Sequence, residues 1–161
     1  MVATTVNTNS RSTPISADLG PLIERASCIL TEAGTGMTLF RQTVLTEIAT
    51  SPQPLGAYIL ADRIGQKLGK RVAPNSIYRV LELFCELGVV RRVESRHAYC
   101  LVTSDDASAV LLMCDDCGGI QAVGSGEVHD AVSRQIEAAG FRPNRQVIEV
   151  AGRCQNCENT H

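Results

Sequence analysis

The stretch that decides the fold is APNSIYRVLELFCELG, residues 73–88. Its apolar side chains recur every three or four residues, which predicts an amphipathic helix with one buried face. Pro74 suits the first helical turn because its missing N–H would have no intrahelical partner there, and Gly88 is a typical helix terminator. The predicted buried stripe consists of Ile77, Val80, Leu81, Phe84 and Leu87.

The side chains at the start of this helix are not explained by packing. Asn75, Ser76, Tyr78 and Arg79 all lie near its N-terminal end and away from the apolar stripe. In DNA-binding proteins, side chains of these types contact phosphates and base edges. The alternative is a small helical domain with no role in nucleic-acid binding.

Three further helices are expected upstream of this stretch. One covers residues 21–33 and is closed by Gly34, and another runs through residues 56–69. Between them, Thr38 is a suitable N-cap for a helix that ends before Pro52. The predicted buried face of this middle helix consists of Phe40, Val44, Leu45 and Ile48.

Downstream, the runs VVRRVE and HAYCLV predict a β-hairpin connected at Ser95-Arg96. Helices followed by a hairpin form a winged helix, in which the last helix enters the major groove and the hairpin flanks the DNA backbone. Residues 20–102 carry ten Lys/Arg against seven Asp/Glu, whereas residues 103–161 carry four against nine. This asymmetry favours two modules, of which the first is mildly basic.

The bulk composition limits the class of protein. The chain has 161 residues, of which 44% are hydrophobic, so it can form one ordinary domain or two small ones. It contains no apolar run long enough to cross a bilayer and no secretory signal pattern, so we expect it in the cytoplasm. Seven cysteines in a reducing compartment point to metal binding rather than to disulfides.

The C-terminal segment changes pattern. AVLLMC, GIQAV and QVIEVA predict three strands, and GEVHDAVSRQIEAAG predicts a helix ahead of the last strand. Such an α+β unit of about 50 residues is too small to bury a sufficient core by itself. It needs a covalent or metal staple, a partner subunit, or both.

Two Cys-x-x-Cys pairs follow strands of this unit and provide four thiolates, Cys114, Cys117, Cys154 and Cys157. Four sulfur ligands make up the closed tetrahedral set of structural zinc. Redox use of the pairs is the alternative, but a redox Cys-x-x-Cys usually opens a helix. The aspartates of CDDC are expected to face solvent, and Cys28 and Cys85 to lie in the helical core. No nucleophile–base pair or phosphate loop is present, so we do not expect an enzyme or a small-molecule substrate.

At this point the sequence resembles a known family. PNSIYRVLELFCELGVVRRVES, followed by CDDCG and GRCQNC, is similar to the ferric uptake regulator superfamily, and PLGAYILADRI and RVESRHAY to its zinc uptake regulators. The resemblance implies a homodimeric, metal-responsive repressor that binds an operator in double-stranded DNA. By the same resemblance Tyr78 and Arg79 face the DNA, Arg41 contacts a phosphate, and the four paired cysteines bind zinc.

The resemblance also implies a second, sensory metal at the hinge, but here the sequence departs from the family. The histidine-rich segment ahead of the first cysteine pair is replaced by TSDDASAVLLMC. His97, Cys100, Asp105 and Asp106 are candidates for a replacement site, for which zinc would be the best-suited ion. Glu94 and His129 are reserves. The alternatives are a degenerate site, or a regulator that senses oxidation or another ligand through Cys100.

The predicted architecture is therefore α+β, with a winged helix-turn-helix domain and a small α/β dimerisation domain that contains a four-cysteine zinc site. We predict a disordered tail over residues 1–18, the DNA-binding domain over 19–102, a hinge over 103–108 and the dimerisation domain over 109–161. A zinc-stapled protein-interaction module without DNA function is the remaining alternative.

Overall fold

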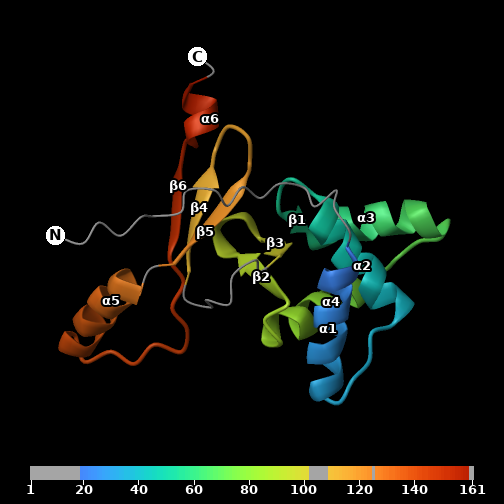
Figure 1. Cartoon of the computed structure of the whole chain (residues 1–161), viewed down its shortest axis with the longest axis horizontal. Coiled ribbons are helices and arrows are strands. Elements are labelled where there is room, and N and C mark those ends of the chain that lie inside the picture. The colour runs from blue at the N-terminus through green and yellow to red at the C-terminus, as the bar shows by residue number, and fades with distance from the viewer. Residues whose placement is uncertain (1–18, 102–108, 125, 160–161) are drawn as a thin grey trace. The chain divides into compact units, whose positions relative to one another are not determined.

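The computed structural model describes residues 19–101, 109–124 and 126–159. These residues form two compact units, one from residues 19–101 and one from residues 109–159 (Figure 1). The predicted tail and hinge, with Asp105 and Asp106, lie outside the described residues. No helix within the described ranges has both the length and the apolar character needed to cross a membrane.

The first unit contains four helices and a small sheet. The helices are α1 (Gly20–Glu32), α2 (Leu39–Thr50), α3 (Ala57–Leu68) and α4 (Pro74–Glu86). Their ends follow the sequence signals, since the backbone N–H of Arg41 donates to Thr38 Oγ1 at 3.2 Å at the start of α2. Gly34 and Gly69, which follow α1 and α3, have left-handed φ angles of 75° and 62°, which glycine adopts without strain.

The core of this unit confirms the predicted helix faces. Ile77, Leu81 and Phe84 of α4 are fully buried, and Val80 is 8% exposed. They pack in one cluster with apolar residues of α1, α2 and α3 and of the adjacent strands. Because one face of α4 forms the centre of this core, its opposite face is left to solvent.

The wing is a three-stranded antiparallel sheet. The predicted hairpin is formed by β2 (Val90–Val93) and β3 (Ala98–Leu101), joined by a 3-10 turn (Glu94–Arg96). A short strand that was not predicted, β1 (Leu55–Gly56), pairs with β3, so the strand order is β1-β3-β2. This pairing connects the wing to the start of α3.

The second unit has the predicted strand-helix-strand pattern. It contains β4 (Val110–Cys114), β5 (Ile120–Val123), α5 (Gly126–Ala138), β6 (Glu149–Gly152) and α6 (Gln155–Glu158). β4 is the central strand, antiparallel to β5 and parallel to β6. Its side chains Val110, Leu111 and Met113 are buried, whereas α5 contributes no buried residue.

Candidate metal centre and nucleic-acid interface

The four paired cysteines of the second unit converge on one place. The parallel register of β4 and β6 sets Cys114 opposite Gly152, so both strands end at the same edge of the sheet. The turns that follow are called here the first knuckle, residues 114–117, and the second knuckle, residues 154–157. All four Sγ atoms lie within 4.8 Å of one another.

The spacing of the sulfurs fits a tetrahedral metal ion. Cys117 Sγ and Cys154 Sγ are 3.9 Å apart. A zinc–sulfur bond of about 2.3 Å implies sulfurs about 3.8 Å apart in a regular tetrahedron. A side chain on Gly119 would place its Cβ 3.3 Å from Cys117 Sγ, so glycine at this position leaves room for the thiolate.

The thiols of this cluster differ in their pKa values. The backbone N–H groups of Cys117 and Cys154 donate to Cys114 Sγ and lower the pKa of this thiol to about 6, and the second of these bonds measures 3.3 Å. By contrast, a hydrogen bond with the Cys154 thiol, followed by burial, raises the pKa of Cys157 to about 12. The cluster can therefore hold one thiolate and retain protons that a divalent metal would displace.

The remaining cysteines lie outside this cluster. Cys85 is half-buried in α4 and packs against the helical core, as expected. Cys28 is exposed, so its predicted core placement is wrong. The buried residues of α1 are Ala26 and Leu30, and position 28 points away from both.

The start of α4 presents the predicted polar side chains. Asn75, Ser76 and Arg79 are exposed, and Tyr78 is half-buried. The ring of Tyr58, at the start of α3, meets the Tyr78 ring edge-on with their centroids 6.3 Å apart. Tyr58 is 66% exposed and was missed in the sequence, although a tyrosine off the apolar stripe at a helix start is the same signal as at Tyr78.

Basic side chains accompany this aromatic pair. Arg63 on α3, and Lys70 and Arg71 in the connection to α4, are all exposed. Together with Arg79 they give the α3–α4 pair an exposed set of cations, which suits a polyanionic ligand.

Arg41, in the first turn of α2, bonds to the connection that precedes this helix. Its guanidinium Nη1 donates to Thr35 Oγ1 at 2.8 Å and to the carbonyl oxygen of Gly36. These bonds hold the connection between α1 and α2 against the start of α2. Its predicted phosphate contact stays a prediction.

His97 and Cys100 are not gathered with a third ligand among the described residues, where the four paired cysteines are the one cluster of potential ligands. Cys100 lies on β3 opposite Arg91. His97 is exposed in the turn of the wing, and its Nδ1 lies 3.3 Å from Arg92 Nη2. The two remaining candidates, Asp105 and Asp106, lie outside the described part of the chain.

Comparison with known proteins identifies a matching family and similar regulators. The sequence model described as the Ferric uptake regulator family matches residues 32–151. The chain is 27% identical over 139 residues to the zinc uptake regulation protein of Escherichia coli K12, and the match covers 84% of this chain and 81% of the relative. The named relatives are uptake regulators and not enzymes, which agrees with the expectation from the sequence.

Two solved structures share the fold. A zinc uptake regulator complexed with zinc and DNA superposes with a TM-score of 0.82 at 26% identity, covering 90% of this chain and 98% of that chain. The holo form of a regulator named XcZur gives a TM-score of 0.76 at 27% identity, covering 86% and 98%.

Proposed function

Because the chain belongs to the ferric uptake regulator family, we propose that it is a zinc-responsive repressor that binds an operator in double-stranded DNA as a homodimer. Its place of action would be the cytoplasm. The similar solved structure that contains both zinc and DNA supports this proposal at the level of the whole fold.

The observation that carries the proposal is the exposed start of α4. Arg79 and Tyr58 are exposed on helices whose other faces pack in the core, and Tyr78, which is half-buried against that core, meets the ring of Tyr58 edge-on. In a helix-turn-helix the start of the second helix contacts base edges in the major groove, where arginine pairs with guanine and an aromatic ring packs on a thymine methyl group. We therefore assign base reading to these side chains and phosphate contacts to the surrounding cations.

Cys114, Cys117, Cys154 and Cys157 would hold one structural zinc per chain. Their spacing fits the ion, and the hydrogen-bonded Cys114 thiolate provides the first anionic ligand. Bound zinc would supply a crosslink between two strand ends and no reactive chemistry. A crosslink is what a unit of this size lacks, because its single sheet buries few side chains.

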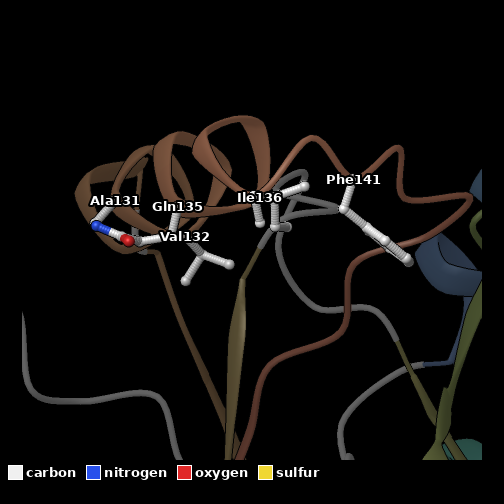
Figure 2. Close-up of a pocket in the computed structure, with 6 residues that line it drawn as sticks. Ala131, Val132, Gln135, Ile136 and Phe141 are labelled. Carbon is white, nitrogen blue, oxygen red and sulfur yellow. The ribbon is translucent and has the colours of Figure 1, made fainter.

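The homodimer is proposed to form through α5. This helix packs only lightly on the other elements and leaves Val128 44% exposed and Phe141, just beyond its end, 65% exposed. Figure 2 shows the side chains on its apolar face together with Phe141. These side chains surround a hollow of about 550 Å³. The hollow is lined by Ala131, Val132, Gln135, Ile136, Ala139 and Phe141. A second copy of the chain is the occupant that a two-fold operator requires.

A second candidate function is a regulator of the same fold whose signal is not zinc. It is favoured by the guanidinium of Arg92, which lies beside His97 although it also pairs with Glu94 at 3.3 Å, and by the position of Arg91 opposite Cys100 in the β2–β3 register. Positive charges close to candidate ligands oppose cation binding. In this case the four-cysteine zinc remains structural, and oxidation or another ligand would act through Cys100.

The test is selection of DNA from a random duplex pool, with zinc present and after chelation of loosely held metal. The wild-type chain should enrich a two-fold symmetric sequence in zinc, and its affinity should fall steeply with salt as counterions are released. Arg79→Ala should weaken binding to that sequence about 5- to 100-fold, the value of a bidentate base contact.

Arg134→Ala serves as the matched control, since it removes one exposed arginine from the other compact unit. Enrichment that does not depend on zinc would favour the second candidate. If no sequence is enriched under either condition, the chain is not a DNA-binding regulator.

A further inference from the structure

An ion pair joins the two knuckles outside the thiol cluster. Arg153, which directly precedes the second knuckle, places its Nε 2.6 Å from Oδ2 of Asp116, which lies inside the first knuckle. The aspartates of the first knuckle were expected to face solvent, and Asp116 is indeed 37% exposed. Its carboxylate nevertheless crosses to the other strand end, which the sequence pattern does not indicate.

The second knuckle is held by strand pairing and hydrogen bonds rather than by buried side chains. β6 and α6 contain no buried residue, and α6 is a single turn of four residues. By contrast, the first knuckle continues β4, whose Met113 and Cys114 are buried. Two hydrogen bonds also connect the strand ends. The backbone N–H of Asp115 donates to the backbone oxygen of Gly152 at 2.8 Å, and the backbone N–H of Cys154 donates to the side-chain Sγ of Cys114 at 3.3 Å.

We propose that the Arg153–Asp116 ion pair is a latch that holds the second cysteine pair in ligating position, and so sets how fast the site loses its metal. Arg153 and Asp116 are positioning residues, because neither is a ligand. With zinc bound, the latch would keep the thiols of the second knuckle next to those of the first, so that a ligand which had dissociated could rebind. Preorganisation of this kind reduces the entropy lost on each rebinding. The inference rests on the proposed four-cysteine zinc site.

A simpler explanation makes a different prediction. A zinc ion bound by four thiolates has a net negative charge, and in the simpler explanation Arg153 stabilises that complex through its positive charge alone. Under that explanation, removing the negative charge of Asp116 would relieve repulsion and slow the loss of zinc. The latch predicts the opposite sign for Asp116, because removing either partner frees the second knuckle.

The experiment measures the rate at which the zinc-loaded full-length protein transfers metal to an excess of a metallochromic chelator. Arg153→Gln and Asp116→Asn should each accelerate the transfer about two- to five-fold, which corresponds to an exposed ion pair. The exchanged pair, Asp116→Arg with Arg153→Asp, should recover much of the wild-type rate. Glu158→Gln is the matched control, since it removes a carboxylate next to Cys157 that forms no ion pair within the described residues.

A separate measurement tests the four-cysteine zinc site independently of the latch. Cobalt bound by four thiolates gives an intense charge-transfer absorption, so wild-type protein without this absorption would refute the zinc site itself. If wild type and variants all show the absorption, the folded site is intact and the rates test the latch alone. Slower transfer in Asp116→Asn, equal rates throughout, or no recovery in the exchanged pair would each overturn the latch.

Discussion

At the scale of single residues, the unequal thiols of Cys114 and Cys157 predict a proton count. The pKa of Cys114 lies at about 6 and that of Cys157 at about 12, against an ordinary value of 9.0. Near neutral pH, Cys114 has already lost its proton. Uptake of zinc by the four thiols should then release fewer than four protons, rising toward four as the starting pH falls below about 6. Proton release in weakly buffered solution measures this number.

The same shifts fix the sign of two contributions to the stability of the metal-free chain. The pKa of Cys114 is lowered in the folded state, so its contribution is present above pH 9.0 and is lost as the pH falls through about 6. The pKa of Cys157 is raised, so its contribution is present below pH 9.0 and is lost as the pH rises through about 12. For the proton count on zinc uptake, release of four protons at neutral pH would contradict the prediction that Cys114 is already ionised.

Arg41 has two candidate roles that a single variant separates. Its bonds to Thr35 and Gly36 predict that Arg41→Ala loosens the α1–α2 connection and lowers the free energy of unfolding by about 1–2 kcal/mol. A phosphate contact instead predicts that the slope of log affinity against log salt becomes shallower by about one. Denaturant unfolding and DNA titration at several salt concentrations measure the two effects independently, and a variant that changes neither would exclude both roles.

At the scale of elements, a buried carboxylate joins α2 to α3. Glu47 is 4% exposed on α2 and pairs with Lys67 near the end of α3. Lys67→Ala leaves this charge buried without its cation, and should destabilise the first unit by about 1–3 kcal/mol in denaturant unfolding. Replacing Glu47 by Gln in the same chain should recover part of the loss, because the unpaired charge is then gone. Equal stability of Lys67→Ala and wild type would show that water alone satisfies Glu47.

Glu47 also illustrates what the sequence could and could not predict. Helical periodicity predicted Phe40, Val44, Leu45 and Ile48 as the buried face of α2. The last three are buried, and Phe40 is half-buried against the core. The periodicity gave no reason to bury the glutamate among them, because the partner lies 20 residues away on another helix. Strand β1 was missed because two residues are too short to show a period, and it exists only through its pairing with β3.

The candidate metal centre was predictable for a different reason. The spacing of Cys114 and Cys117, repeated at Cys154 and Cys157, encodes the ligands locally, and the parallel pairing of β4 with β6 then brings both pairs together. The ion pair between Asp116 and Arg153 depends on that three-dimensional pairing and leaves no pattern in the sequence.

At the scale of the whole molecule, the described residues of the second unit leave an apolar surface uncovered. Its sheet buries side chains of β4 and Ile120 of β5, while the apolar side chains of α5 face a hollow of about 550 Å³. An exposed apolar surface of this kind in a small unit indicates a protein interface. Zinc can crosslink the strand ends but does not cover α5, so metal binding and dimerisation should stabilise the unit separately.

The last prediction therefore concerns assembly. Ile136→Glu places a charge in the apolar face of α5 and should convert the proposed dimer to a monomer, as measured by sedimentation. The monomer should lose affinity for a two-fold symmetric DNA site but keep its thiolate–cobalt absorption, because Ile136 does not belong to the thiol cluster. Arg134→Glu introduces the same side chain on α5 at an exposed position outside the hollow and should remain dimeric. A dimeric Ile136→Glu would place the interface on another surface.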